Sequence, residues 1–203
     1  MTPDPTLSER EIIVGGDANH SDEEYTRRLG ESISACVKLL KTGRWLSVVF
    51  QHWNIAYFHA ILAAAAEHGA ALRAAVSQIG DPIWSMHKKK GTDSVLAGEL
   101  ILTFFNTGRR VEYRTGRPFD LEAEVHGLIT RATSPIFGEH LFNALILRAW
   151  DAGSIDSLNV SKVAFSGLLS DFGLSYDDKG HFWTKTDRRF GRLDLLSNSD
   201  AAE

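Results

Sequence analysis

Residues 44–106 constrain the fold most strongly, because β-rich and helical segments alternate along them. Two β-rich runs, 45–50 and 72–79, flank an apolar, Ala-rich helical segment at 55–68. This order is typical of a crossover unit, whose strands run parallel in one sheet. A third β-rich run, 95–105, follows the second after a basic turn too short to hold a helix. We therefore expect the last two strands to form an antiparallel pair at the edge of the sheet.

A helix is expected directly before this stretch. Ser21 and Glu24 form a Ser-x-x-Glu capping box, which satisfies free amide groups at a helix start. Apolar residues then recur at spacings of three and four, which predicts one face for packing on a sheet. These residues are Tyr25, Leu29, Ile33, Cys36 and Leu40. The pattern predicts a helix that ends at Gly43 and a buried, structural thiol at Cys36.

A family resemblance rests on residues within 48–105. They are the strand that ends in Phe50-Gln51-His52, the Ile83-Trp84 segment, a lysine-rich turn and the closing strand 99–102. Together they resemble the distal half of DNA amino-methyltransferases, which act on adenine N6 or cytosine N4. The resemblance covers roughly residues 10–107, about half of the chain. It implies an α/β fold with a partial methyltransferase-type, Rossmann-like sheet that finishes with an antiparallel hairpin.

Two motifs of that family are absent from the sequence: the glycine-rich cofactor turn and the catalytic Asp-Pro-Pro-Tyr tetrad. The segment 81–84, Asp-Pro-Ile-Trp, lacks the second proline, and we interpret it as a turn. The segment 14–17, Val-Gly-Gly-Asp, is interpreted as a loop, since no strand-to-helix junction surrounds it. The resemblance implies S-adenosylmethionine as the cofactor of a complete enzyme. We expect this chain alone to bind no cofactor and to supply no catalytic residue.

Candidate binding residues follow the first strand. In open α/β sheets, ligands bind beyond the carboxyl ends of the strands. Gln51, His52 and Trp53 occupy this place, and the resemblance adds Trp84 to the same wall. The alternative is structural: His52 and Asn54 cap the next helix while Trp53 packs beneath it.

Basic residues supply a second group of candidates for binding DNA. One cluster lies in the turn before the third strand, and an arginine pair follows that strand. These residues are His87, Lys88, Lys89, Lys90, Arg109 and Arg110. Adjacent cations can neutralise the phosphates of a DNA strand without reading its sequence. The alternative for the lysine run is a solvated loop.

The sequence changes character after Phe105. We expect a methyltransferase-like domain at 1–108, a basic linker at 109–118, a helical domain at 119–196 and a disordered tail at 197–203. The helical domain is predicted to hold helices at 119–132, 137–152 and 160–172, the last capped by Asn159 or Ser161, and then a hairpin that turns at 177–180. This order fits a winged-helix-like domain whose third helix reads a DNA groove. Alternatively, these elements pack on the α/β domain.

Composition narrows the function classes. A formal net charge of −4 argues against a globally basic nucleic-acid binder, and a single cysteine excludes an internal disulfide. His59 and His68 lack partners at metal-ligand spacing, so we predict packing or capping roles for them and no metal site. The N-terminus lacks the pattern of a signal peptide, and we expect a cytoplasmic protein with no membrane contact.

The function predicted from these observations is the C-terminal portion of a site-specific DNA methyltransferase, inactive by itself. Its expected partners are DNA and a second chain that carries the cofactor-binding half. The alternatives are a partner subunit of a split methyltransferase, with an exposed strand edge, and a DNA-binding module without catalysis.

Overall fold

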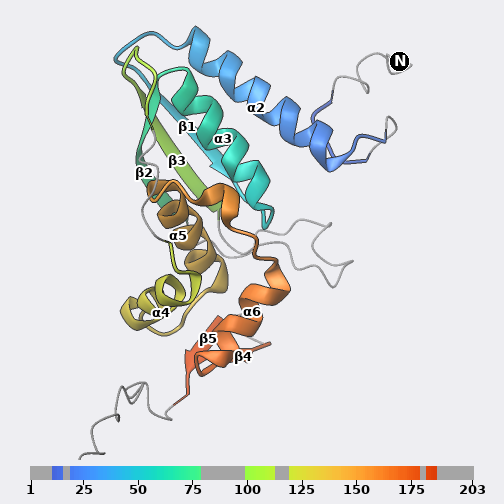
Figure 1. Ribbon diagram of the computed structural model, residues 1–203, viewed down its shortest axis with the longest axis vertical. Helices are drawn as coiled ribbons and strands as arrows, with labels where there is room; N and C mark the ends of the chain where they lie inside the picture. The colour runs from blue at the N-terminus through green and yellow to red at the C-terminus, as the bar shows by residue number, and fades with distance from the viewer. Residues whose placement is uncertain (1–10, 16–18, 79–98, 113–118, 179–181, 187–203) are drawn as a thin grey trace, which may run out of the picture.

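A computed structural model of the protein describes residues 11–15, 19–78, 99–112, 119–178 and 182–186. Within these residues the chain is a mixed α/β structure. It forms five α helices, a three-stranded antiparallel sheet and a two-stranded antiparallel hairpin (Figure 1). The predicted mixture of helices and strands is therefore confirmed at this level.

The helices α2 (Asp22–Leu39) and α3 (Ile55–Glu67) form one layer. The predicted start of α2 is confirmed, because the Ser21 hydroxyl accepts a hydrogen bond from the amide of Glu24 at 3.2 Å. The helix ends at Leu39, four residues before Gly43, with Leu40 as its cap, and Gly43 follows with a φ of 77°. Such a φ favours glycine, so Gly43 turns the chain into the first strand.

Cys36 is exposed, so the prediction of a buried thiol is wrong. The buried residues of α2 are Ile33 and Val37, which are four positions apart. Because α2 packs mainly against another helix, α3, its buried stripe is narrow. Cys36 lies one position to the side of this stripe.

The sheet has the order β1-β3-β2, with β1 at Trp45–Phe50, β2 at Ala70–Gln78 and β3 at Glu99–Asn106. The predicted antiparallel pairing of β2 with β3 is confirmed. β1 and β2 point in the same direction, as expected for a crossover through α3. However, β3 lies between them, so the expectation of parallel neighbours is wrong for the described sheet. β3 carries the fully buried side chains of Leu100, Leu102 and Phe104, and its central position lets it pair along both edges.

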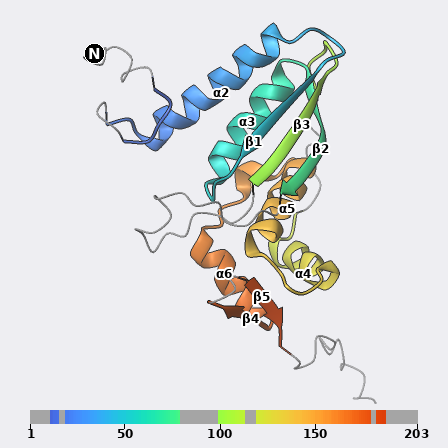
Figure 2. The same cartoon turned by 180° about the vertical axis from the view of Figure 1, so that it is seen from behind.

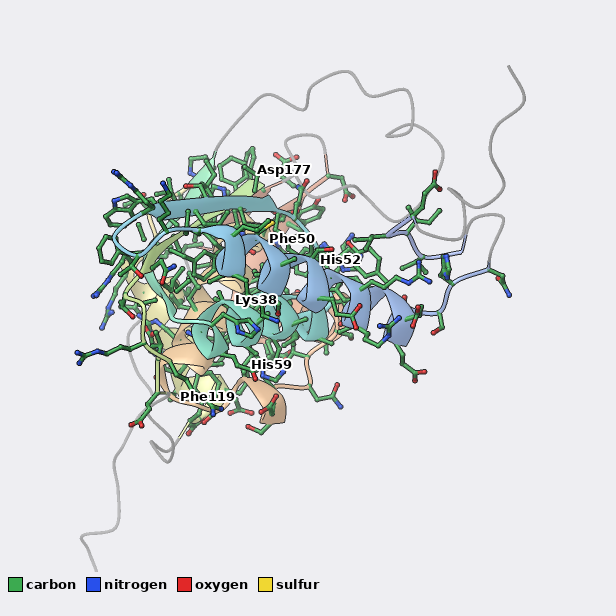
Figure 3. The ribbon with its side chains drawn as sticks, turned by 90° about the horizontal axis from the view of Figure 1, so that it is seen from above. Lys38, Phe50, His52, His59, Phe119 and Asp177 are labelled. Carbon is green, nitrogen blue, oxygen red and sulfur yellow. The ribbon has the colours of Figure 1, made fainter. Side chains whose placement is uncertain are left out.

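The two faces of the sheet differ in their cover. Leu100, Leu102 and Phe104 of β3 are at most 1% exposed, and they lie on the face that the helices cover. Figure 3 shows α2 and α3 on the same side of β1. On the other face, Trp45 and Val49 remain 57% and 56% exposed. Antiparallel sheets commonly leave one face accessible to solvent, and this second face is called the open face below.

The remaining elements follow β3 in sequence. They are α4 (Leu121–Arg131), α5 (Gly138–Asp151), the short 3-10 helix η2 (Ile155–Ser157), α6 (Lys162–Asp171), β4 (Leu174–Asp177) and β5 (Phe182–Lys185). The three predicted helices and the hairpin are thus confirmed within two residues of their expected ends. Of the two caps considered for α6, Ser161 is the observed one, since its hydroxyl accepts from the amide of Ala164 at 3.2 Å.

This helical part packs against one end of the sheet. α5 lies next to the sheet, whereas α4, α6 and the hairpin lie farther away (Figure 2). The rings of Trp53, after β1, and Phe142, on α5, are 4.6 Å apart. The hydrophobic core extends without interruption from α2 to Trp183 on β5. The segments on either side of the predicted linker therefore share one core.

No helix of the described residues is both long and apolar enough to cross a membrane.

Replacement of Leu102 by alanine tests the assignment of the core. Leu102 is fully buried, so Leu102→Ala should lower the free energy of unfolding by about 3 kcal/mol. Leu39 is 87% exposed, and the matched change Leu39→Ala should cost less than about 0.5 kcal/mol. Urea denaturation followed by circular dichroism measures both. Equal effects of the two substitutions would contradict the position of the core.

Candidate functional site at the carboxyl end of β1

The candidate site begins where β1 ends. Gln51, His52 and Trp53 follow Phe50 at the carboxyl end of the strand, as the sequence predicted (Figure 3). The side-chain oxygen of Asn54 accepts from the amide of Ala56 at 3.0 Å, which caps α3. The turn is thus held rigidly between β1 and α3.

His52 accepts a hydrogen bond through Nδ1 from the amide of Asn54 at 2.8 Å. This bond fixes the ring and assigns the proton of the neutral imidazole to Nε2. Trp53 packs on Phe142 and also lies 6.3 Å from the ring of Phe165. The structural roles considered for Asn54 and Trp53 are therefore observed.

A cavity of about 690 Å³ opens beside this turn. It lies between the start of α3 and the segment that runs from η2 into α6. Its lining is formed by His52, Trp53, Asn54, Ile55, Ala56, His59, Ile155, Asp156, Leu158, Asn159, Val160, Ser161 and Lys162. The predicted residues His52 and Trp53 thus share one cavity with residues from the helical part.

The charges of the cavity are mixed. His59 Nδ1 lies 2.9 Å from Asp156 Oδ1, and this pair links α3 to η2. Lys162 Nζ lies 5.7 Å from the centre of the Trp53 ring, within the range of a cation–π contact. Neither α3 nor α6 carries an acidic residue in its first turn. Their amino-terminal dipoles and Lys162 favour an anionic group, whereas Asp156 on the wall opposes one.

A hydrogen-bonded cluster behind His52 ties the site to α2. Tyr57 donates from its hydroxyl to Asp22 Oδ1 at 2.8 Å, and its ring lies 4.5 Å from the ring of His52. Burial, with the nearby Asp22 carboxylate, raises the pKa of Tyr57 to about 12. Burial also lowers the pKa of His52, and Asp22 only partly offsets this effect. His52 is therefore a neutral imidazole at pH 7.

Arg109 and Arg110 do not belong to this site. They follow β3, which runs opposite to β1, so they lie at the other end of the sheet. The amide of Thr107 donates to the carbonyl of Gly69 at 2.8 Å, just before β2 begins. Strands of this length span roughly 20 Å, and this distance separates the two arginines from the end of β1. Both are exposed.

The other predicted site residues lie outside the described residues. They are Trp84, His87, Lys88, Lys89 and Lys90. Their proposed contact with DNA stays a prediction.

Sequence reasoning missed the pairing of His59 with Asp156. His59 was expected to pack or to cap a helix, and Asp156 carried no signal at all. The two residues are far apart in the sequence, and no local spacing connects them. Only the packing of η2 against α3 brings them together.

Among the described residues, no group of three or more His, Cys, Asp or Glu side chains could hold a metal ion. A comparison of the chain with protein families, with curated proteins and with solved structures finds no match.

The lowered pKa of His52 predicts a pH dependence of stability. Because the folded protein holds His52 neutral, the unfolded chain binds the extra proton first as the pH falls through 6.5. Stability should therefore be complete above this value and fall below it, until the pH reaches the lower pKa of the folded state. Between about pH 8 and about pH 5.5, His52→Gln should lose less stability than the unsubstituted protein. Urea unfolding at each pH measures the difference.

His140 provides the control, because burial lowers its pKa as well. His140→Gln should remove only the contribution of His140 to the loss of stability at low pH. The contribution of His52 should remain. A pH dependence that is the same with and without His52 would contradict the neutral imidazole.

Proposed function

We propose that this chain is the distal, non-catalytic portion of a DNA amino-methyltransferase and becomes active only when a cofactor-binding portion completes it. One observation carries the proposal: β1 and β2 point the same way, are connected through α3, and enclose the antiparallel strand β3. The family resemblance implied a crossover unit followed by an antiparallel hairpin; the sheet has the crossover direction and the antiparallel pair, but β3 lies between the two other strands. The polar turn that follows β1 then lies at the ligand-binding end of the sheet.

The open face and the free edge of the sheet support an incomplete domain. Trp45 and Phe105 lie side by side on the open face with ring centres 4.8 Å apart, and Val76 on β2 is 57% exposed. Large exposed apolar groups in one patch are typical of an interaction surface. A sheet with helices on both faces would bury them.

The described residues do not fit S-adenosylmethionine. The cofactor turn of the family needs glycine between a strand and a helix, and the turn at 51–54 contains none. The start of α3 is occupied by the side chain of Asn54, which caps it. Gly15 lies before α2, in an isolated bridge with His20, and no strand precedes it among the residues that the structure describes. We therefore assign the cofactor, which supplies the methyl group, to the completing portion.

This chain contributes a wall beside the DNA. At pH 7, neutral His52 holds its remaining proton on Nε2, so it can donate one hydrogen bond but carries no charge. The ammonium group of Lys162, which lines the cavity, can bind a phosphate there. These contacts position DNA without reading its bases.

The helical part gives little support to the alternative function, a DNA-binding module without catalysis. The third helix of this part, α6, exposes Val163 at 81%. Its first residue, Lys162, is its one basic residue, and Asp171 ends it. A recognition helix needs base-contacting polar groups and a positive face.

Calorimetry tests the proposed function. The chain alone should show no heat of S-adenosylmethionine binding, because its residues do not form the cofactor site. Mixed with the cofactor-binding half of a DNA amino-methyltransferase, it should raise both cofactor binding and methyl transfer to DNA above those of that half alone. The matched control is the same half with an unrelated protein of equal size. Cofactor binding by the chain alone, or no gain in the mixture, would refute the proposal.

A further inference from the structure

The position of α2 identifies where the missing part of the sheet attaches. A strand-helix-strand crossover between parallel strands is almost always right-handed. From β1, the chain crosses through α3 to β2, which lies on the β3 side of β1. α2 leads into β1 and lies on the same side of the sheet as α3 (Figure 3). By the same handedness, a strand that precedes α2 would lie on the opposite side of β1 and parallel to it.

No described strand occupies this position. The sheet order begins with β1, whose outer edge has no partner in the described part of the chain. The described residues just before α2 form only an isolated bridge between Gly15 and His20. Among the described residues, this edge of β1 therefore remains available to an added strand.

The register shows which groups of β1 are available. The amide of Asn106 donates to the carbonyl of Arg44 at 2.9 Å, so Arg44 points its backbone toward β3. The backbone N–H and C=O groups of successive residues point alternately to the two edges of a strand. Starting from the residue after Arg44, every second residue of β1 therefore points its backbone groups away from β3. These residues are Trp45, Ser47 and Val49. Their side chains also lie on the open face, so one row presents both hydrogen-bonding and apolar groups.

The two outer edges of the sheet differ in their protection. The outer strand β2 has a bulge between Leu72 and Ala74, where Arg73 is exposed. Bulges and charges are the devices that keep other strands from adding to an edge. β1 pairs with β3 over six consecutive residues without a bulge and contains no charged residue. An uncharged edge of this kind accepts an uncharged strand.

We propose that the outer edge of β1 binds an uncharged β strand of a partner polypeptide, parallel to β1, and that the same partner covers Trp45 and Val49. The partner is the cofactor-binding half, so this inference rests on the proposed function. Strand addition supplies affinity through main-chain hydrogen bonds, and the side chains on the open face supply selectivity.

Hydrogen exchange tests the proposed edge. The probe is the cofactor-binding half of a DNA amino-methyltransferase, ending with the strand before the helix that corresponds to α2, and joined by a flexible linker to the start of the full chain. Such a linker raises the local concentration of the half. The amides of Trp45, Ser47 and Val49 should exchange at least tenfold more slowly in this fusion than in the chain alone. Unchanged exchange would overturn the proposal.

Proline substitutions separate the two edges. Ser47→Pro removes an outward amide of β1 and leaves the ladder to β3 intact, as edge strands tolerate. It should weaken binding of the untethered half at least tenfold. Ser77→Pro is the matched control, because Ile101 pairs with Val76 and the next backbone group of β2 points outward. Ser47→Ala controls for the lost contact between the Ser47 and Thr103 hydroxyls, which lie 3.1 Å apart. Neither control should change binding.

The outcomes distinguish this inference from the proposed function. Protection of β1 without cofactor binding or methyl transfer would support the edge and refute the methyltransferase. Methyl transfer without protection of β1 would support the methyltransferase and refute the edge. Equal binding by Ser47→Pro, or a loss with Ser77→Pro alone, would overturn the edge. A dimer of the chain alone that Ser47→Pro converts to a monomer, measured by sedimentation, would show a second copy as the occupant and also overturn it.

Discussion

The pairing of β3 with both of its neighbours is the constraint on which the described structure depends. It places Leu100, Leu102 and Phe104 at the centre of the core and joins β1 to β2 through backbone hydrogen bonds. Because β3 uses both of its edges, β1 and β2 become the outer strands. The carboxyl end of β1 then faces the helical part, and Trp53 packs against Phe142.

The contact of Trp53 with the helical part leaves one buried polar group without a hydrogen bond in the described part of the chain, which lowers the stability of the fold. Its indole nitrogen is buried and has no hydrogen-bond partner among the described residues. An unmade hydrogen bond of this kind costs about 1–3 kcal/mol. The ring offsets it by contact with Phe142 and Phe165 and with the Lys162 ammonium group. Packing therefore decides the position of Trp53, and this position sets the wall of the cavity.

Local signals in the sequence predicted most of the elements. The capping box at Ser21 and the cap at Ser161 define the starts of α2 and α6 through neighbours in sequence. Strand order could not be predicted in this way, because an apolar strand does not reveal which strand lies beside it. The cavity has the same difficulty: Gln51–Trp53 were found from the end of a strand, but His59 and Asp156 meet only through tertiary packing.

The unequal protection of the two outer strands supports the proposal that the sheet is extended at one of its edges. A sheet that functions alone needs protection on both edges, because either can add a foreign strand. Here β2 carries a bulge and the exposed Arg73, whereas β1 is regular and uncharged. The open face supports the same interpretation, because Trp45 and Phe105 form an aromatic pair there and Trp45 remains exposed to solvent. The partner proposed above would extend the sheet from β1 and cover its open face, and so would account for both features.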